Sequence, residues 1–336
     1  MADNLILLGH GSGGLLSHEL IEQVFLRHFA NAALAPLEDA ALLEFPGSRL
    51  AFTTDSYVVK PIFFPGGDIG KLAVCGTVND LAMRGAHPLY ISAGFIIEEG
   101  LPVTELEQVV ASMATTAREA GVSIVCGDTK VVEKHAADKL FINTAGVGAV
   151  PDQIDVSVGN ARPGDSLILS GTVGDHGMAI LSQRQGLAFR SSITSDAAPL
   201  NGLVSNMLNI CPHVRAMRDP TRGGLATTLN EIAKSSGVGI EIEEGKVPVS
   251  EAVEWACEML GLDYLYLANE GKLVAIVPEP EAARLVDAMR RHRHGREAVV
   301  IGHVTEGHPG KVVMRNAYGV RRVIDVLASD QFPRIC

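Results

Sequence analysis

Three aspartates and two lysines in the first half of the chain have the chemistry of a magnesium and phosphate site. Asp55 and Asp128 each follow an apolar stretch that is typical of a strand, and Asp80 interrupts the apolar character of a predicted helix. Carboxylate oxygens are the ligands that Mg2+ prefers, and Lys71 and Lys130 would supply positive charge to phosphate. Mg2+ usually takes only one or two carboxylates, so not all three need to be ligands. The alternative is that they are unrelated turn or cap residues, since spacing alone does not show that they converge.

Two glycine-containing segments partly match nucleotide-binding motifs. Residues 9–14 fit G-x-G-x-x-G after a short predicted strand and before a helical pattern. A dinucleotide site also needs an acidic residue at the end of the next strand, whereas Glu38 and Asp39 precede that strand. The pair Gly70-Lys71 lacks the Ser or Thr that follows the lysine of a P-loop. The first segment is therefore interpreted as a glycine-rich loop with another purpose.

Cys336, the last residue of the sequence, is a candidate reactive group. Residues 327–336 show no helical or strand period, and an extended segment of that length would span on the order of 30 Å. Such an arm could carry a sulfur atom into a cleft, and the alternative is a frayed end without function. The sequence has 5 cysteines and no Cys-x-x-Cys pair, so it predicts neither disulfides nor a thiolate zinc site.

The elements that must position these residues alternate between strands and helices, which favours a mixed α/β protein. In the first half we predict strands over 5–8, 40–44, 50–54, 89–97, 122–126 and 140–147, with helices after Gly70 and over 103–120. Pro151 and the glycines at 159 and 164 indicate a linker, after which the alternation repeats. The predicted division is a glycine-rich loop and N-terminal helix (1–36), an N-terminal domain (37–152), a C-terminal α/β domain (153–326) and a flexible tail (327–336).

The composition predicts a globular cytoplasmic protein and argues against two classes of partner. At 336 residues, with 47% hydrophobic and 20% charged residues, the chain is long enough for two cores. Its net charge of -11 argues against a nucleic-acid groove or an anionic membrane surface, because both need clustered Lys and Arg. The N-terminus lacks the basic region of a signal peptide, and no apolar stretch approaches the roughly 18 residues of a membrane span.

Two polar turns in the second half are further candidate sites. The first places Asp219, Arg222 and two glycines at the start of a predicted helix, where free N–H groups favour anions. The second consists of Asn269, Glu270 and Gly271 and lies against a predicted strand.

Taken together, these motifs resemble the HypE family of hydrogenase maturation proteins. The match spans the whole chain and rests on the segments 10–14, 54–57, 63–67, 79–80, 127–130, 219–224, 269–271 and 333–336. Most of them are shared by an ATP-binding superfamily that includes aminoimidazole ribonucleotide synthetase, selenophosphate synthetase and thiamine-monophosphate kinase, whereas the Pro-Arg-Ile-Cys end is specific to HypE. Pro220 departs from the pattern, in which alanine is more frequent, but proline is tolerated at the start of a helix.

The resemblance implies a carbamoyl dehydratase whose substrate is its own tail. In this family the C-terminal cysteine, here Cys336, receives a carbamoyl group from the partner HypF, and the group is dehydrated to a thiocyanate. The cyanide then passes to iron held by a HypC–HypD complex and becomes a ligand of NiFe hydrogenase. Oxygen is a poor leaving group until it is phosphorylated, which accounts for ATP and Mg2+, and the elimination needs a base for the amide protons.

The resemblance also implies roles for individual residues. The implied Mg2+ ligands, directly or through water, are Asp55, Asp80 and Asp128, and Lys71 and Asn79 would contact phosphates. Lys130 and Glu270 would transfer protons at the carboxamide. Arg222 would orient the modified tail, and Arg334 would offset the charge of the terminal carboxylate. The complete set of implied ATP contacts is Asp55, Lys71, Thr77, Asn79, Asp80, Gly127, Asp128, Thr129 and Asn143.

The implied architecture is the two-domain, mixed α/β (α+β) PurM-like fold of aminoimidazole ribonucleotide synthetase. The N-terminal domain would bind ATP and would form a β-barrel shared across a homodimer. ATP would lie near the dimer interface, covered by the loop from His10 to Gly14. Two other functions stay open. A related enzyme could phosphorylate the amide oxygen of a free small molecule and leave Cys336 idle, and a non-catalytic thiol carrier would consume no nucleotide.

Overall fold

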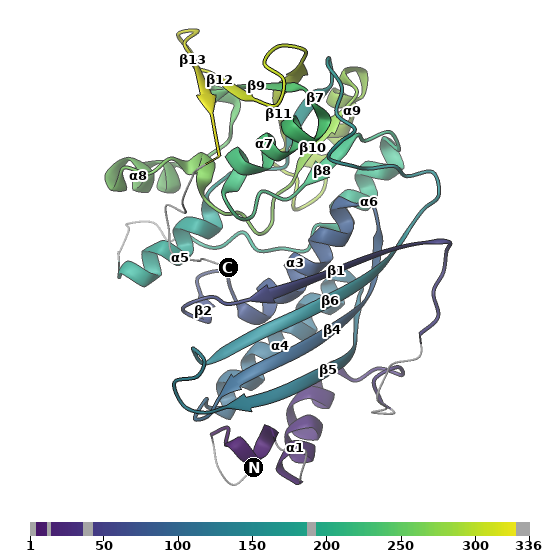
Figure 1. Ribbon diagram of the computed structural model, residues 1–336, viewed down its shortest axis with the longest axis vertical. Helices are drawn as coiled ribbons and strands as arrows, with labels where there is room; N and C mark the ends of the chain where they lie inside the picture. Colours follow the sequence, from purple (N-terminus) through teal and green to yellow (C-terminus); the bar gives the residue numbers. More distant parts are fainter. Residues whose placement is uncertain (1–4, 12–14, 36–42, 187–192, 327–336) are drawn as a thin grey trace.

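Two β-sheets, each with helices packed against it, build the chain (Figure 1). The structure is a computed structural model that describes residues 5–11, 15–35, 43–186 and 193–326. The first sheet belongs to the N-terminal half and the second to the C-terminal half, and each has its own hydrophobic core. No helix in the described part of the chain combines the length and the apolar character that a membrane crossing requires.

The N-terminal sheet has four strands in the order β1 (Arg49–Tyr57), β6 (Leu140–Val150), β4 (His87–Glu98) and β5 (Ser123–Val132). Alternate residues of β1 are exposed, which is the period of a strand with one covered face. α4 (Val103–Ala120) connects β4 to its parallel neighbour β5, and the other neighbours are antiparallel. β1 and β5 are therefore the two edges of the sheet, and α4 and α3 (Ile69–Met83) cover one of its faces (Figure 1).

α3 is buried along almost its whole length between this sheet and α4. Asp68 caps the helix by accepting hydrogen bonds from the backbone N–H groups of Gly70 at 2.7 Å and Lys71 at 3.0 Å. Gly70 lets the two helices approach closely, since a Cβ there would lie 2.5 Å from the carbonyl oxygen of Val109. The helix thus carries Asn79 and Asp80, near its C-terminal end, to the boundary with the second domain.

Short helical turns precede the first sheet: η1 (Leu8–Gly11), α1 (Leu15–Leu20), η2 (Ile21–Leu26) and α2 (Arg27–Phe29). Phe25 anchors them to the N-terminal core, where its ring centroid lies 4.9 Å from that of Phe95. A small hairpin, β2 (Phe63–Phe64) with β3 (Gly67–Asp68), precedes α3. The predicted strand over 5–8 is wrong, because Leu5 makes only an isolated bridge and a 3-10 turn begins at Leu8.

The C-terminal sheet has seven strands, which lie in the spatial order β13 (Arg321–Ile324), β12 (Val312–Arg315), β9 (Gly239–Glu243), β11 (Val299–Thr305), β7 (Ser166–Leu169), β10 (Val274–Val277) and β8 (Ala216–Arg218). β7 and β10 are buried on both faces, as their unbroken apolar character requires. α7 (Gly224–Ser236) packs in the core on one face, and α6 (Asn201–Ile210) and α9 (Glu279–Arg290) pack in the core on the other.

Two further helices and two short turns complete the second domain. α5 (Asp175–Gln185) and α8 (Glu251–Leu260) pack against each other around a small apolar cluster that contains Met178 and Val253. The turns are η3 (Glu244–Lys246) and η4 (Tyr264–Tyr266).

Most predicted elements exist with shifted ends: the helix after Gly70, the helix over 103–120 and the strands over 89–97, 122–126 and 140–147 correspond to α3, α4, β4, β5 and β6.

The two domains share side chains as well as a boundary. Ala197 belongs to the N-terminal core, and Ala82 and Met83 of α3 belong to the core beside α6 and α9. Asn201 donates from Nδ2 to the carbonyl oxygen of Ala120 at 2.7 Å, across the same boundary. Buried contacts of this kind fix the orientation of one domain on the other.

His294 gives the contact between the domains a pH dependence. Its Nε2 lies 3.7 Å from Glu119 but is buried without a hydrogen-bond partner among the described residues. Burial, together with Arg293 and His292, lowers the pKa of His294 to about 4. A histidine in the unfolded chain has a pKa of ~6.5. As the pH falls, the unfolded state therefore binds a proton before the folded state does. The free energy of unfolding is highest above pH ~6.5 and decreases as the pH drops toward the folded pKa.

We expect wild-type protein to lose about 1 to 2 kcal/mol more stability than His294→Gln between pH 7 and pH 5, because only the wild-type unfolded state takes up this proton. Urea unfolding at both pH values measures the difference. His303→Gln, which changes an exposed histidine of β11, is the matched control and should follow the wild type. Equal losses in wild type and His294→Gln would contradict the assignment.

Candidate functional site

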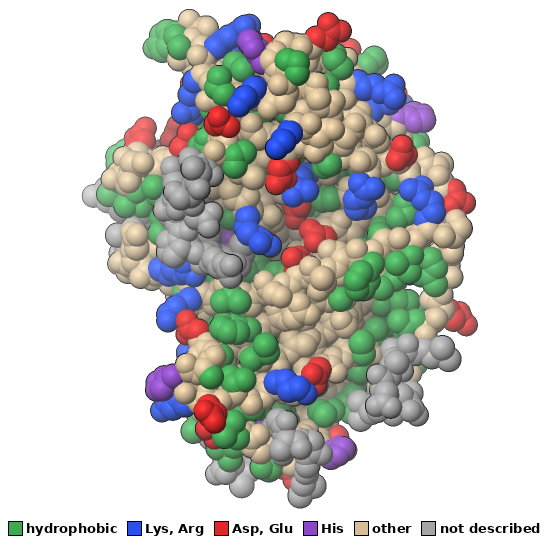
Figure 2. Space-filling model, in the orientation of Figure 1, with side chains coloured by type: hydrophobic (Ala, Val, Ile, Leu, Met, Phe, Trp, Pro, Cys, Tyr) green, Lys and Arg blue, Asp and Glu red, His purple; other side chains and the backbone are tan. Residues whose placement is uncertain are grey.

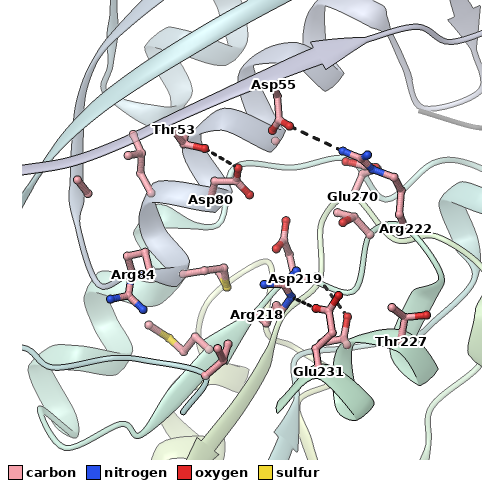
Figure 3. Close-up of a pocket in the computed structure, with 18 of the residues that line it drawn as sticks. Thr53, Asp55, Asp80, Arg84, Arg218, Asp219, Arg222, Thr227, Glu231 and Glu270 are labelled. Atoms are coloured by element: carbon pink, nitrogen blue, oxygen red, sulfur yellow. Dashed lines mark hydrogen bonds and ion pairs between the residues drawn. The ribbon is translucent and has the colours of Figure 1, made fainter. Parts of the chain in front are cut away.

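A cleft of about 660 Å3 lies between the two domains, where Figure 2 shows charged side chains of both signs gathered in a hollow. β1 and α3 form its N-terminal wall, and β8, the turn after it and α7 form its C-terminal wall. The charged residues that line it are Asp55, Asp80, Arg84, Arg218, Asp219, Arg222, Glu231 and Glu270 (Figure 3). The cleft is therefore polar and suited to a charged ligand.

Three aspartates from three different elements point into this cleft. Asp55 comes from β1 and Asp80 from α3, and Asp219 follows β8. Thr53 donates to Oδ2 of Asp80 at 2.8 Å. Burial, with the nearby charges of Asp219 and Asp55, raises the pKa of Asp80 to about 7, and burial raises the pKa of Asp219 to about 6. Carboxylates that raise one another's pKa in this way create a field that favours a cation.

Arginines balance part of this negative charge. Arg222 lies 3.9 Å from Asp55, with most of its side chain in solvent, and Arg218 forms an ion pair with Glu231 at 2.7 Å. The structure therefore brings Arg222, which we predicted to orient a tail, next to one of the predicted metal ligands. An exposed guanidinium at the mouth of a cleft is free to bind an anionic or carboxamide group.

Glu270 lies at the back of the cleft, with 4% of its surface exposed. Figure 3 shows it beside Asp55 and Arg222. The preceding residue, Asn269, donates from Nδ2 to the carbonyl oxygen of Pro220 at 2.9 Å and so ties this turn to the one that carries Asp219. The two polar turns that the sequence indicated therefore meet at a single site.

Two residues that we predicted to contact ATP, Asn79 and Thr77, are buried and hydrogen-bonded within the chain. Asn79 is 1% exposed, and its Nδ2 donates to the carbonyl oxygens of Ala198 at 3.1 Å and Glu270 at 3.3 Å, while its Oδ1 accepts from Leu200 N–H at 2.8 Å. Thr77 is fully buried and shares a hydrogen bond of 2.5 Å with Thr144. Both side chains are therefore engaged in hydrogen bonds within the chain, and their predicted ATP contacts stay predictions.

Lys71 is separate from the carboxylates of the cleft. It lies in the first turn of α3, nine positions before Asp80, which corresponds to about 13 Å along the helix. Its Nζ donates to the carbonyl oxygen of Gly66 at 2.9 Å, and it does not line the cleft. Lys71 therefore does not lie beside Asp55 and Asp80 within one chain, and its phosphate contact stays a prediction.

Asp128 and Lys130 lie on β5, at the opposite edge of the sheet from Asp55. Three strand spacings, about 14 Å in all, separate β5 from β1. The exposed carboxylate of Asp128 pairs with Lys130 at 3.1 Å on the face that the helices leave open. Asn143 lies on the same face, where its Nδ2 donates to Ser56 Oγ at 3.0 Å. Within a single chain, these residues do not join the interdomain cleft.

A second pocket of about 260 Å3 lies beside β5. Gly127, Asp128, Thr129 and Lys130 form its rim, and residues of the N-terminal helical turns, including Phe25 and His10, form its mostly apolar wall. The predicted ATP contacts are thus divided between two places: Asp55 and Asp80 in the cleft, and residues 127–130 at this pocket.

The donor set in the cleft fits a magnesium ion held by two carboxylates. No group of three His, Cys, Asp or Glu side chains placed to hold a metal ion occurs among the residues that the structure describes. Mg2+ commonly takes one or two carboxylates and keeps its waters, so Asp55 and Asp80 suffice as a pair. Arg334 and Cys336 lie outside the described residues.

Several residues of the site were not among our predicted ligands. Asp219 was part of a recognised polar turn, but nothing in the sequence assigned it to the same cleft as Asp80. Tyr57 is buried beside Asp55, at 3.2 Å, and burial together with Asp55 raises its pKa well above the ordinary value. The feature of the sequence that could have identified Tyr57 is its position two residues after Asp55, because residues two apart in a strand share one face of the sheet.

Replacing Asn79 with alanine should destabilise the protein by about 2 to 4 kcal/mol, because two buried carbonyl groups and one buried N–H group each lose a hydrogen bond. Urea denaturation measures this loss. Asn160→Ala, which removes one exposed hydrogen bond to Asp155, is the matched control and should cost less than about 1 kcal/mol. A loss as small as that of the control would contradict the structural role of Asn79.

Comparisons with known proteins cover both domains of the chain. Residues 37–150 match the N-terminal domain and residues 162–315 the C-terminal domain of the AIR synthase related proteins. A carbamoyl dehydratase HypE from Azotobacter vinelandii is 54% identical over 327 residues, which cover 97% of this chain and 96% of the relative.

Two solved structures extend the likeness to three dimensions. A hydrogenase maturation protein HypE in complex with ATP is 53% identical, with a TM-score of 0.95 over 98% of this chain and 99% of that chain. A chain from a HypE–HypF complex is 52% identical, with a TM-score of 0.81 over 92% of this chain and 99% of that chain. The predicted two-domain, mixed α/β fold is confirmed, and the chain belongs to the HypE family of hydrogenase maturation proteins.

Proposed function

We propose that this chain is an ATP-dependent carbamoyl dehydratase that acts on its own Cys336 during hydrogenase maturation. Full-length similarity to relatives of that name supports the proposal. The observation that carries the chemistry is the position of Glu270, which is buried yet lines a cleft of carboxylates and arginines. A carboxylate shielded from water at the back of a cleft is placed to accept a proton from a bound group.

The proposed reaction balances without a redox partner. The carboxamide oxygen of Cys336 S–C(=O)–NH2 attacks the γ-phosphorus of ATP, the bond to ADP breaks, and an S–C(=NH)–O–phosphate forms as one N–H proton leaves. Loss of the second N–H proton and cleavage of the C–O bond release phosphate and leave S–C≡N. Glu270 and Lys130 are our candidates for proton transfer at the carboxamide, and the carboxylate of Glu270 is the acceptor that the elimination requires.

The pocket beside β5 suits the nucleotide. Its apolar wall, which includes Leu20, Phe25 and Phe29, matches the face of an adenine ring. Gly127 to Lys130, at the rim, would face the phosphates with backbone N–H groups and one ammonium group. His10, the first residue of the loop predicted to cover the nucleotide, also lines this pocket, and residues 12–14 of that loop lie outside the described residues.

Magnesium would be held by Asp55 and Asp80, with Asp219 close to both. When bound, the ion would neutralise charge on the transferred phosphate. Thr53 donates to Asp80 and Tyr57 donates to Asp55, so each carboxylate is oriented before any cation arrives. Asp128, the third predicted ligand, would have to come from a second chain.

A homodimer would bring the two parts of the site together. Leu50, Phe52 and Ile96 expose 57%, 65% and 43% of their surface on the face that the helices leave open. This face and the two edges, β1 and β5, are what a second copy would cover in a shared β-barrel. Two-fold symmetry would place β5 of one protomer beside β1 of its partner, and with it Lys130 near the cleft that contains Glu270.

The partners follow from the family. We propose HypF as the carbamoyl donor, since a structurally similar HypE was solved in a HypE–HypF complex, and a HypC–HypD complex as the cyanide acceptor. Arg222, exposed at the mouth of the cleft, would receive the carbamoylated tail.

The alternative is an enzyme that phosphorylates the amide oxygen of a free small molecule, for which the same cleft has room.

Intact-protein mass separates these functions. We expect carbamoylated Cys336 to lose one water when ATP and Mg2+ are added, and Glu270→Gln to slow this step by about 100-fold or more, because the base is lost. Glu231→Gln, a carboxylate on the same cleft that is paired with Arg218, is the matched control and should retain most of the rate. If the adduct persists unchanged in wild type, the proposed reaction is wrong.

A mixing experiment tests the shared site. Lys130→Ala and Glu270→Gln proteins should each be slow, whereas dimers reassembled from an equal mixture should regain about a quarter of wild-type activity, because half of the dimers then contain one intact composite site. Each variant reassembled with itself is the control. A mixture no faster than the two variants alone would place both residues in the site of one protomer and contradict this arrangement.

A further inference from the structure

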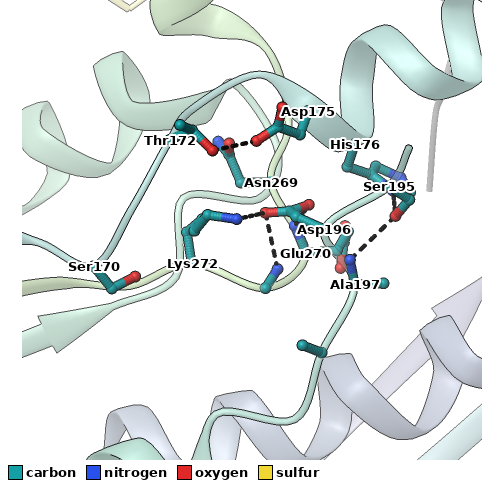
Figure 4. A network of polar contacts seen from close by, with 12 residues as sticks. Ser170, Thr172, Asp175, His176, Ser195, Asp196, Ala197, Asn269, Glu270 and Lys272 are labelled. Atoms are coloured by element: carbon teal, nitrogen blue, oxygen red, sulfur yellow. Dashed lines mark hydrogen bonds and ion pairs between the residues drawn. The ribbon is translucent and has the colours of Figure 1, made fainter. Parts of the chain in front are cut away.

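Behind Glu270 lies a buried polar network that the proposed reaction does not use (Figure 4). Its centre is Asp196, in the chain segment between α5 and α6, with a side chain that is 5% exposed. This segment crosses from one domain to the other: Ser195 donates its backbone N–H to Pro65 of the N-terminal domain at 2.8 Å. A carboxylate buried so far from solvent requires specific partners.

The partners of Asp196 are three consecutive residues of the Glu270 turn. Oδ1 accepts from the backbone N–H of Glu270 at 3.0 Å, and Oδ2 accepts from Gly271 N–H at 3.3 Å and from Lys272 Nζ at 3.0 Å. The two segments are in direct backbone contact, since a Cβ at Gly271 would lie 1.9 Å from the carbonyl oxygen of Asp196. Asp196 thus binds the whole turn through one carboxylate.

The groups around Asp196 stabilise its negative charge. Burial alone would raise its pKa, but Lys272, the Glu270 N–H group and His176 outweigh burial, so that its pKa is lowered. Lys272 is itself mostly buried, with 13% of its side chain exposed. A buried ion pair that also accepts two backbone hydrogen bonds is a rigid support, because removing either partner leaves a charge without compensation.

We propose that Asp196 is a positioning residue that sets the direction of the Glu270 side chain. Asp196 holds the N–H group of Glu270, and Asn79 holds its carbonyl oxygen from the N-terminal domain. With both peptide groups held, rotation of the backbone at Glu270 is blocked and its side chain stays directed at the cleft. The inference rests on the proposed role of Glu270 as a base.

Asp196→Asn tests the inference, because asparagine keeps the shape but must turn its NH2 group toward at least one donor, either Glu270 N–H or the pair Gly271 N–H and Lys272 Nζ. We expect the dehydration rate at saturating ATP to fall roughly 10- to 100-fold, with the KM for ATP unchanged. In a Glu270→Gln background the same substitution should cause no further loss, since a residue that acts through Glu270 has nothing left to position. Single-turnover mass measurements on carbamoylated Cys336 give all these rates.

Asp175→Asn is the matched control. Asp175 is a neighbouring half-buried carboxylate that accepts hydrogen bonds from Ser250 and Thr172, both outside the Glu270 turn, so its loss should leave the dehydration rate within about twofold of wild type. If Asp196→Asn does not fold, Lys272→Gln carries the same test, because it removes the charge that compensates Asp196. Its loss of rate should be smaller and should likewise vanish in the Glu270→Gln background.

The outcomes separate this inference from the proposed function. A Glu270→Gln protein as fast as wild type would overturn the role of Glu270, and the role of Asp196 with it. A slow Glu270→Gln protein combined with a wild-type rate in Asp196→Asn would overturn only the positioning role. A further loss in the double variant that multiplies the two single losses would also overturn it, since Asp196 would then act independently of Glu270.

Discussion

The side chain of Asn79 is the contact on which the joint between the two domains depends. One amide group, carried by the buried helix α3, satisfies the carbonyl oxygens of Ala198 and Glu270 and the N–H group of Leu200. Because none of these backbone groups is exposed to water at this point, each needs a protein partner, and a single short side chain supplies all three. The position of the cleft between the domains follows from this joint, since Asp80 is the next residue along α3.

Glu270 illustrates how a reactive group is held by backbone contacts. Its N–H group is bound by Asp196 and its carbonyl oxygen by Asn79, and these two residues come from opposite sides of the domain boundary. A movement of one domain relative to the other would therefore disturb the turn that carries Glu270. This rigid support requires a buried ion pair between Asp196 and Lys272. Burying two charges removes them from water and adds little stability, so such a pair serves geometry rather than stability.

The division of the predicted ATP contacts between two pockets reflects the order of strands in the N-terminal sheet. Asp55 lies on one edge strand and Asp128 on the other, so a single sheet cannot bring them together. The apolar side chains on its open face, Leu50, Phe52 and Ile96, suggest why the chain tolerates this separation. In the proposed dimer the edges of two sheets meet, and a site divided in one chain becomes continuous.

Much of the fold could be predicted from local patterns. A strand repeats every two residues and a helix every three to four, and a single sequence displays that spacing directly. This spacing accounts for the alternating exposure of β1, the long amphipathic α4 and the apolar strands β7 and β10. The strand expected over 5–8 failed because a short apolar run does not by itself provide a neighbour to pair with.

The candidate site was predicted in its residue types and only partly in its geometry. The sequence by itself indicated the superfamily, through motifs at Asp55, Asp80, Asp128 and the 269–271 turn, and the family, through the Pro-Arg-Ile-Cys end, because a motif is local chemistry. Only the tertiary structure decided that Asn79 braces backbone groups, that Asp219 and Glu270 face Asp80, and that Asp196 supports Glu270. These contacts join residues more than 70 positions apart, and such pairs are chosen by packing between domains, for which spacing along the chain carries no signal.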